Sequence, residues 1–251
     1  MLQSFVLWNK AVCLKLTPRY YQPDRLYLRY DRIIAQLVAA TPGQTILDIG
    51  AGKWSSYAEG LTSRNGCTFI GLDCDADEMG RNPFLDQRLL ADASDTIPLP
   101  DASVDLVISR ATLEHIRDNA KLMRDVNRVL KPGGQLLCVF AGRNAPFAIL
   151  NRMLPPRVTR VLLDRLSPDN ADHLGFLTHY DRTTFKGFSG LIGAAGLRID
   201  NAEVHYFSSN YFAFFLPVYA LSMLADALRA VLGVKAIASY YLFFATKAAS
   251  P

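Results

Sequence analysis

The chain has 251 residues, a formal net charge of +4 and an apolar fraction of 50%. This length suits one domain with a sizeable core. Because the charge is mild and no basic run alternates with aromatic residues, we expect no nucleic acid as partner. The four cysteines are scattered without metal-ligand spacing, so we predict reduced thiols in a cytoplasmic protein and no metal site.

An amphipathic helix is predicted at residues 24–40, before Pro42-Gly43 ends the pattern. Its apolar positions share one helix face: Leu26, Tyr30, Ile33, Ile34, Leu37 and Val38. Residues 1–41 are therefore expected to form an N-terminal helical cap that partly covers a ligand site. Between Phe5 and Leu16, apolar residues alternate loosely with Lys10 and Lys15, and no small-residue cleavage site follows, so no signal peptide is expected.

A glycine turn follows the next predicted strand. Thr45–Ile49 has the composition of a buried strand, and the turn Gly50-Ala51-Gly52 comes directly after it. A second strand, Cys67–Leu72, ends about 20 residues further on at Asp73. In open α/β sheets such glycines let the backbone approach a nucleoside, and the acid accepts hydrogen bonds from ribose hydroxyls.

A dinucleotide-binding turn is the competing interpretation. Its fingerprint would need a third glycine at position 55, where this chain has Ser55. Ser56 and Glu59 instead predict a capping box at the start of the following helix. A bulky turn with a side-chain cap suits a ligand without phosphates, so an NAD(P)-dependent oxidoreductase is the weaker alternative.

Further segments occur in order after this turn: Leu90–Ala93, Ile97–Ser109, Leu113–Ile116 and Val129–Leu137. Together with the glycine turn, they resemble the class I S-adenosylmethionine (SAM)-dependent methyltransferases, in the small-molecule group called type 11. The chain departs from this pattern at Trp54, where many members have another glycine. The resemblance implies an α/β, Rossmann-like sheet of seven strands, mostly parallel with an antiparallel last strand, with helices on both faces and helical cover insertions.

The resemblance also implies a cofactor, SAM, and residues that bind it. It places Asp48 and the glycine turn at the methionine moiety, Asp73 at the ribose, Asp92 and Ala93 at the adenine, and Ser109 and Arg110 toward the reacting centre. The expected cofactor-binding set is Asp48, Gly50, Ala51, Gly52, Asp73, Cys74, Asp92, Ala93 and Ser109. Two alternatives stay open, because Asp48 could be only a loop anchor and Arg110 could form a surface ion pair. His115 is expected to cap or pack near its helix start rather than to act as a base.

Residues 142–182 interrupt the alternation of strands and helices and are interpreted as an insertion that covers the acceptor. A helix is predicted at Arg157–Leu166, and another at Thr183–Ala195 with Asp181, Thr183 or Thr184 as its N-cap. Arg110, His179 and Tyr180 are the candidate catalytic residues. With His173 and Asp181, the last two could take a proton from a hydroxyl acceptor. Alternatively, Tyr180 packs and His179 is solvated, since an aligned methyl transfer can proceed without a base.

The C-terminal part, 183–251, contains two further predicted strands, Leu197–Phe207 and Ser239–Lys247. An apolar insertion at 208–236 separates them and is expected to be helical to Leu232. Its uncharged run 211–224 is shorter than the ~20 residues that span a bilayer. It either packs on its own domain or a partner subunit, or offers an apolar wall to a long-chain acceptor or to the headgroup region of a membrane.

We therefore predict a single methyltransferase domain over 1–251, with a cap at 1–41, a cofactor-binding core at 42–141, a substrate cover at 142–182 and the C-terminal part at 183–251. The expected reaction transfers a methyl group from SAM to a small or lipid-like acceptor at oxygen, with carbon and nitrogen left open. Peripheral membrane contact and the oligomeric state also stay open. A SAM-binding interaction module without catalysis is the alternative function.

Overall fold

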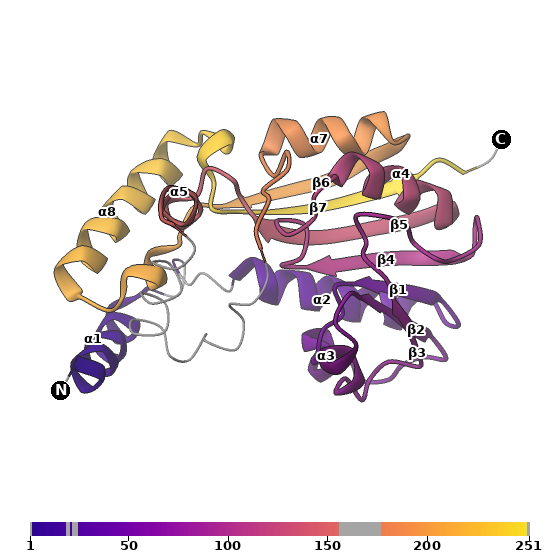
Figure 1. The fold of residues 1–251 in the computed structure, drawn as a ribbon, viewed down its shortest axis with the longest axis horizontal. Helices are drawn as coiled ribbons and strands as arrows, with labels where there is room; N and C mark the ends of the chain where they lie inside the picture. The colour runs from indigo at the N-terminus through magenta and orange to yellow at the C-terminus, as the bar shows by residue number, and fades with distance from the viewer. Residues whose placement is uncertain (1, 19–20, 22–24, 156–176, 250–251) are drawn as a thin grey trace.

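Seven strands form one sheet in the computed structural model, which describes residues 2–18, 21, 25–155 and 177–249 (Figure 1). The strands are β1 (Thr45–Ile49), β2 (Thr68–Asp73), β3 (Gln87–Leu90), β4 (Val104–Arg110), β5 (Leu130–Ala141), β6 (Leu197–His205) and β7 (Tyr240–Lys247). Their order in the sheet is β3-β2-β1-β4-β5-β7-β6. Only β7 runs antiparallel to its neighbours β5 and β6. The predicted Rossmann-like class, with its antiparallel last strand, is confirmed.

Helices cover both faces of the sheet, so the central strands are buried on both sides (Figure 1). Such strands are near-continuous apolar runs, as β1 and β4 are. On one face lie α2 (Arg25–Ala40) and the short α3 (Ala76–Gly80), and on the other lie α4 (Asn119–Val129) and α7 (Phe185–Ala194). The helix predicted at 24–40 is confirmed as α2, which buries Leu26, Tyr30, Ile34 and Val38.

Side-chain caps fix where two of these helices begin. The Asp118 carboxylate accepts hydrogen bonds from the N–H groups of Ala120 and Lys121 at the start of α4. Among the three N-cap candidates for α7, Thr184 is the one that caps, because its hydroxyl accepts from the N–H of Gly187 at 3.1 Å. Asp181 instead accepts from the N–H of Asn119 and so ties the two helix starts together.

The capping box predicted at Ser56 and Glu59 is wrong. Residues Ser56–Gly60 form a 3₁₀-helix, η2, with no side-chain cap. The Ser56 hydroxyl donates to Asp31 on α2 at 2.8 Å, and the neighbouring Ser55 hydroxyl accepts from Asn82. A single 3₁₀ turn is too short to need a reciprocal cap, so both hydroxyls bond to partners from elsewhere in the chain.

A group of helices extends beyond one end of the sheet (Figure 1). It comprises α1 (Leu2–Leu16), α5 (Pro146–Met153), η4 (Ser209–Phe212), α8 (Leu216–Leu232) and η5 (Lys235–Ile237). The insertion predicted to be helical to Leu232 is thus η4 followed by α8. No helix in the described part of the chain is both long enough and apolar enough to cross a bilayer. The helix predicted at Arg157–Leu166 lies outside the described residues, as does His173.

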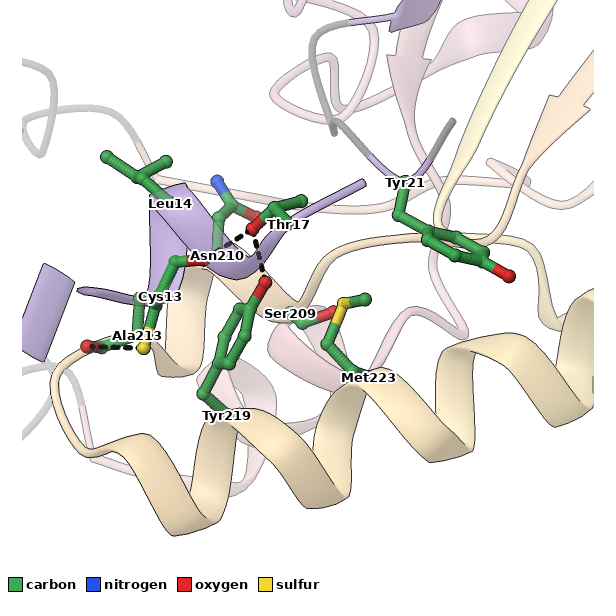
Figure 2. Close-up of a pocket in the computed structure, with 9 residues that line it drawn as sticks. All are labelled: Cys13, Leu14, Thr17, Tyr21, Ser209, Asn210, Ala213, Tyr219 and Met223. Carbon is green, nitrogen blue, oxygen red and sulfur yellow. Dashed lines mark hydrogen bonds between the residues drawn. The ribbon is translucent and has the colours of Figure 1, made fainter. Parts of the chain in front are cut away.

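Helices α1 and α8 of this group pack on one another (Figure 2). The Asn9 side chain accepts from the N–H of Leu216 at 3.0 Å, the Cys13 thiol donates to the carbonyl of Ala213, and the hydroxyls of Thr17 and Tyr219 share a hydrogen bond. A cavity of about 40 Å³ remains between α1, η4 and α8. Its volume is far below the roughly 300–1,000 Å³ of typical ligand pockets, so we assign no ligand to it.

Candidate functional site

The glycine turn after β1 lies at the carboxyl edge of the sheet, where open α/β sheets bind their ligands. Gly50 has φ +75° and Gly52 has φ +48°, both in the left-handed region. A Cβ atom on Gly50 would lie 2.0 Å from the Thr112 hydroxyl oxygen, so only glycine lets this turn pack against the segment after β4. The N–H of Gly50 donates to the carbonyl of Leu72 at 2.8 Å and joins the turn to β2.

Asp73, at the end of β2, holds the same turn from the neighbouring strand. One of its oxygens accepts from the N–H of Gly52 and the other from the N–H of Asp75, both at 2.9 Å. A carboxylate has about four lone-pair positions, so each oxygen of Asp73 can still accept a further donor. Cys74 follows with an exposed thiol. The geometry therefore combines a fixed acid with a backbone that a ligand can approach.

Asn82 supports the turn from a third direction and was missed by the sequence reasoning. Its side chain is fully buried, and its amide group lies 3.2 Å from the carbonyls of Ala51 and Gly52 and 3.1 Å from the Ser55 hydroxyl. A lone asparagine in a loop carries no sequence signal of such a role, because the contact joins segments about 30 residues apart.

Asp48 is a buried carboxyl group beneath the turn. Its Oδ2 accepts a hydrogen bond from the Tyr57 hydroxyl at 2.8 Å. Burial raises the pKa of Asp48 to about 7, although the Tyr57 hydrogen bond and the nearby Arg110 oppose that rise. A cationic ligand group beside Asp48 would favour its charged form, so the arrangement suits an ammonium or a sulfonium.

Asp92 and Ala93 lie after β3 at the same edge. Burial acts to raise the pKa of Asp92, but the N–H of Ser94 at 2.8 Å and the guanidinium of Arg117 at 2.7 Å outweigh it and lower the pKa. Asp92 is therefore an ionised acceptor beside the buried methyl group of Ala93. Such a pair can accept from an amino group on a flat ring and pack against the ring itself.

Ser109 and Arg110 end β4 and have different surroundings. The buried Ser109 hydroxyl donates to the carbonyl of Ile49 at 3.0 Å and so joins β4 to β1. The Arg110 guanidinium carbon lies 4.7 Å from the ring centroid of Tyr27 on α2. This contact holds α2 across the end of β4, next to the glycine turn.

Tyr180 and His179 come from the segment before α7. The backbone N–H groups of both donate to the carbonyl of Glu114 at 2.9 Å, which places this segment over the loop after β4. Tyr180 is buried with φ +51°, and loss of water raises the pKa of its hydroxyl. His179 is half-buried. The structure thus brings both residues to the carboxyl edge of the sheet, on the same side as Arg110.

Glu114 itself is a second buried carboxyl group that the sequence reasoning missed. Its side chain is 5% exposed, and burial raises its pKa to about 7. The neighbouring His115 is the residue for which the sequence suggested a packing or capping role. Burial lowers the pKa of its imidazole, and its Nδ1 lies 3.2 Å from the carbonyl of Leu177. The Leu113–Ile116 sequence pattern does not indicate which of Glu114 and His115 has a functional role. The structure distinguishes them, because the Glu114 side chain is buried and ionisable.

Together these features define an α/β domain whose sheet carries a glycine turn and several carboxylates at its carboxyl edge. Residues 47–138 match the family model described as a methyltransferase domain. A Mycolicibacterium smegmatis protein named as a probable S-adenosylmethionine-dependent methyltransferase is 34% identical over 126 residues, covering 48% of this chain and 47% of that protein. A demethylmenaquinone methyltransferase of Renibacterium salmoninarum is 30% identical over 114 residues, covering 43% and 46%. The chain spans about half the length of these relatives.

A solved SAM-dependent methyltransferase from Mesorhizobium loti shares the fold, with a TM-score of 0.56 at 20% identity, covering 86% of this chain and 95% of that one. Residues 47–138 match the methyltransferase domain of the type 11 group, and a SAM-dependent methyltransferase is among the relatives matched over about half of the chain. These matches confirm the predicted class I SAM-dependent family for this domain, and SAM is the cofactor of that family.

The residues at the carboxyl edge fit that cofactor. The space that a Cβ atom on Gly50 would fill is closed by Thr112, so the turn keeps a bare backbone. Asp73 retains acceptor capacity for two ribose hydroxyls, and the buried Asp48 suits a cationic amino acid moiety. The Nζ atom of Lys53, which follows the glycine turn, lies 3.9 Å from Oε1 of Glu78. Because this lysine pairs with a carboxylate of the protein, the turn suits a cofactor without phosphates.

Proposed function

We propose that the protein transfers the methyl group of SAM to a lipid-like acceptor, at an oxygen atom. The bound cofactor supplies an electrophilic methyl group on a sulfonium. The observation that carries the acceptor class is the uncharged, exposed outer face of α8. The same proposal treats residues 1–251 as one working domain, with 142–182 and 208–236 serving the acceptor.

The proposal gives each site residue a task. Asp48 and the turn Gly50–Gly52 hold the amino acid moiety, Asp73 and Cys74 flank the ribose, and Asp92 with Ala93 holds the adenine. Ser109 keeps β1 and β4 in register below the site. Arg110 and α2 exclude water from the reacting centre. His179 and Tyr180 line the acceptor side above the loop after β4.

The outer face of α8 supports an apolar partner. Four residues along one side of the helix, Leu221, Leu224, Leu228 and Val231, are 58–85% exposed. The charged residues of α8 are Asp226 and Arg229, which form an ion pair turned toward the protein. No charge within α8 therefore opposes contact with hydrocarbon.

Helix α1 packs beside α8 and exposes apolar residues of its own. Trp8 and Leu14 are exposed, and the charged residues of α1 are Lys10 and Lys15. Exposed tryptophan and lysine side chains suit the headgroup region of an anionic bilayer. One relative is named for demethylmenaquinone, which also supports an acceptor of lipid-like chemistry. We therefore propose that the α1–α8 face rests on a membrane that holds the acceptor.

The test uses SAM with a labelled methyl group, incubated with the protein and a whole-cell extract, after which products are partitioned between organic and aqueous phases. Label in the organic phase is the expected result, and an Asp73→Ala variant should lower it when SAM is not saturating. Label only in the aqueous phase would contradict the lipid-like acceptor. Binding of SAM without transfer to any extract would instead favour an interaction module that has lost catalysis.

A further inference from the structure

Glu114 has one oxygen that no group in the described part of the chain satisfies. Its Oε1 accepts from the N–H of Ala141 at 3.3 Å, whereas its Oε2 is buried and has no hydrogen-bond partner among the described residues. A buried polar oxygen without a partner costs free energy, so its retention calls for an explanation. The cofactor-binding residues proposed above do not include it.

The charge of Glu114 acts on tyrosines from four separate segments. They are Tyr27 on α2, Tyr180 before α7, Tyr211 on η4 and Tyr240 on β7. Loss of water is the main reason that the pKa of each hydroxyl is raised, and the charge of Glu114 adds to the rise. None of them donates a hydrogen bond to Oε2.

Three of these tyrosines, Tyr27, Tyr211 and Tyr240, pack with Phe147 into one aromatic wall. The rings of Tyr27 and Tyr240 lie 5.7 Å apart, and Phe147 stacks on Tyr211 at 4.3 Å and on Tyr240 at 5.7 Å. Tyr240 pairs with Ala141 across the sheet, which is the residue that donates to Glu114. The Glu114 carboxyl group is thus hydrogen-bonded to the strand residue that pairs with Tyr240, next to this aromatic wall.

This place adjoins the cofactor turn. Thr112, two residues before Glu114, is the side chain against which Gly50 packs. Arg110, at the end of β4, contacts Tyr27 and so links the same wall to the glycine turn. The segment 110–114 therefore borders the cofactor site on one side and the tyrosine-lined wall on the other.

We propose that Glu114 is a catalytic residue whose Oε2 takes the proton of the acceptor hydroxyl, while the tyrosine-lined wall holds the apolar body of the acceptor. The inference rests on the proposed function. As the bond between acceptor oxygen and methyl carbon forms, the bond between that carbon and sulfur breaks and its electron pair stays on sulfur. The hydroxyl proton passes to Glu114 and then to water, so charge and atoms balance.

The electrostatic surroundings suit this task. A pKa of about 7 leaves Glu114 able to accept a proton and to release it near neutral pH. The titratable and charged groups on the segments around it include the four tyrosines, Arg110, His115, His179 and Arg143, whose guanidinium donates to the carbonyl of Tyr180 at 3.1 Å. None of these groups forms an ion pair with the Glu114 carboxylate in the described part of the chain. The acceptor hydroxyl would be the first donor to reach Oε2.

The closing experiment compares methyl transfer into the organic extract by the wild type and by Glu114→Gln, Glu114→Asp and Glu59→Gln. Glutamine keeps the shape and an acceptor for the N–H of Ala141, and the exposed Glu59 provides the matched control. We expect about a 100-fold or larger loss in Glu114→Gln, a smaller loss in Glu114→Asp and no change in Glu59→Gln. Calorimetry should show unchanged SAM binding in all four.

A second readout does not depend on turnover. Infrared difference spectra of the wild type should show a protonated carboxyl group that titrates near pH 7 and is lost in Glu114→Gln. Asp48→Asn serves as reference for the other buried carboxyl with a pKa of about 7. The wild-type transfer rate should rise with pH through the same range.

The outcomes separate the two proposals. Equal transfer by Glu114→Gln and the wild type, or a flat wild-type pH profile, would overturn the role of Glu114 and leave the methyl transfer intact. No transfer by the wild type to any extract would overturn the proposed function and, with it, this inference. If Glu114→Gln fails to fold, Glu114→Asp and the wild-type profile decide.

Discussion

At the scale of single residues, Asp73 joins the end of β2 to the glycine turn and also points its free lone pairs outward. We predict that Asp73→Ala weakens SAM binding by ~1.5–3 kcal/mol, the range for hydrogen bonds to a charged group. Isothermal titration calorimetry measures this directly. The exposed Asp77 on α3 offers a control, since Asp77→Ala should leave the affinity unchanged. Equal affinity for Asp73→Ala and the wild type would remove Asp73 from the site.

Asp48 should make stability depend on pH. Its pKa is about 7 in the folded protein and about 3.9 in the unfolded chain, so the folded state binds the proton more tightly. Its contribution is complete below about pH 4 and is lost as the pH rises through 7, by roughly 4 kcal/mol at most. Asp48→Asn keeps an acceptor for the Tyr57 hydroxyl and should remove this dependence.

Urea unfolding between pH 4 and 8 checks this prediction. The free energy of unfolding of Asp48→Asn should increase relative to that of the wild type as the pH rises. This difference should level off above pH 7. The exposed Asp95 supplies the control variant Asp95→Asn, which should follow the wild type. If the difference in unfolding free energy between Asp48→Asn and the wild type does not change with pH, the pKa of Asp48 is not raised in the folded state.

The role of a single residue could be predicted from sequence only where its contacts come from neighbouring positions in the chain. Asp48 and Asp73 can be singled out from sequence because Asp48 lies in the last residues of β1, before the glycine turn, and Asp73 ends β2. Glu114 and Asn82 are not, since their burial and hydrogen bonds come from segments far away in the chain. Ser109 has the expected position, but its hydroxyl is used within the sheet.

At the scale of elements, the glycine turn has the sharpest steric requirement. Gly50 and Gly43 both have φ near +70°, but only a Cβ atom on Gly50 would collide with a neighbour, Thr112. We predict that Gly43→Ala costs about 1 kcal/mol of backbone strain, whereas Gly50→Ala costs more and abolishes SAM binding. Thermal unfolding and calorimetry on both variants measure the two effects. Normal SAM binding by Gly50→Ala would contradict the turn as the cofactor cradle.

The elements themselves were largely predictable. Strands buried on both faces have apolar runs, and α2 has a clear 3.6-residue period, so both appear in sequence. The η2 turn was misread because the Ser56–Glu59 pattern fits a capping box, whereas the Ser56 hydroxyl bonds to α2. Exposure of the α8 face could not be predicted, because a mostly apolar helix gives no sign of which side is uncovered.

At the scale of the whole molecule, α1, α5 and α8 form one end that differs in character from the sheet (Figure 1). Trp8 lies on this end and Trp54 lies beside the glycine turn, and the chain has two tryptophans. We predict that in Trp54→Phe the emission of Trp8 shifts to the blue on adding vesicles rich in phosphatidylglycerol. The shift reports transfer of the indole into the headgroup region.

Vesicle flotation with variants checks which surface binds. Leu224→Gln should weaken binding, while Leu90→Gln, on an equally exposed leucine of the edge strand β3, should not. High salt should also weaken binding because Lys15 contributes. No binding, together with a dimer in light scattering that Leu224→Gln dissociates, would assign the face to a second copy of the chain.

The contact between α1 and α8 also orders events during synthesis. The hydrogen bond from Cys13 to Ala213 cannot form until Ala213 is synthesised, 200 residues later. The hydrogen bonds of Asn9 and Thr17 likewise need residues of α8. Helix α1 therefore has no partner on α8 until most of the sheet has been synthesised. During that interval its apolar side chains are open to a chaperone, or to the bilayer itself.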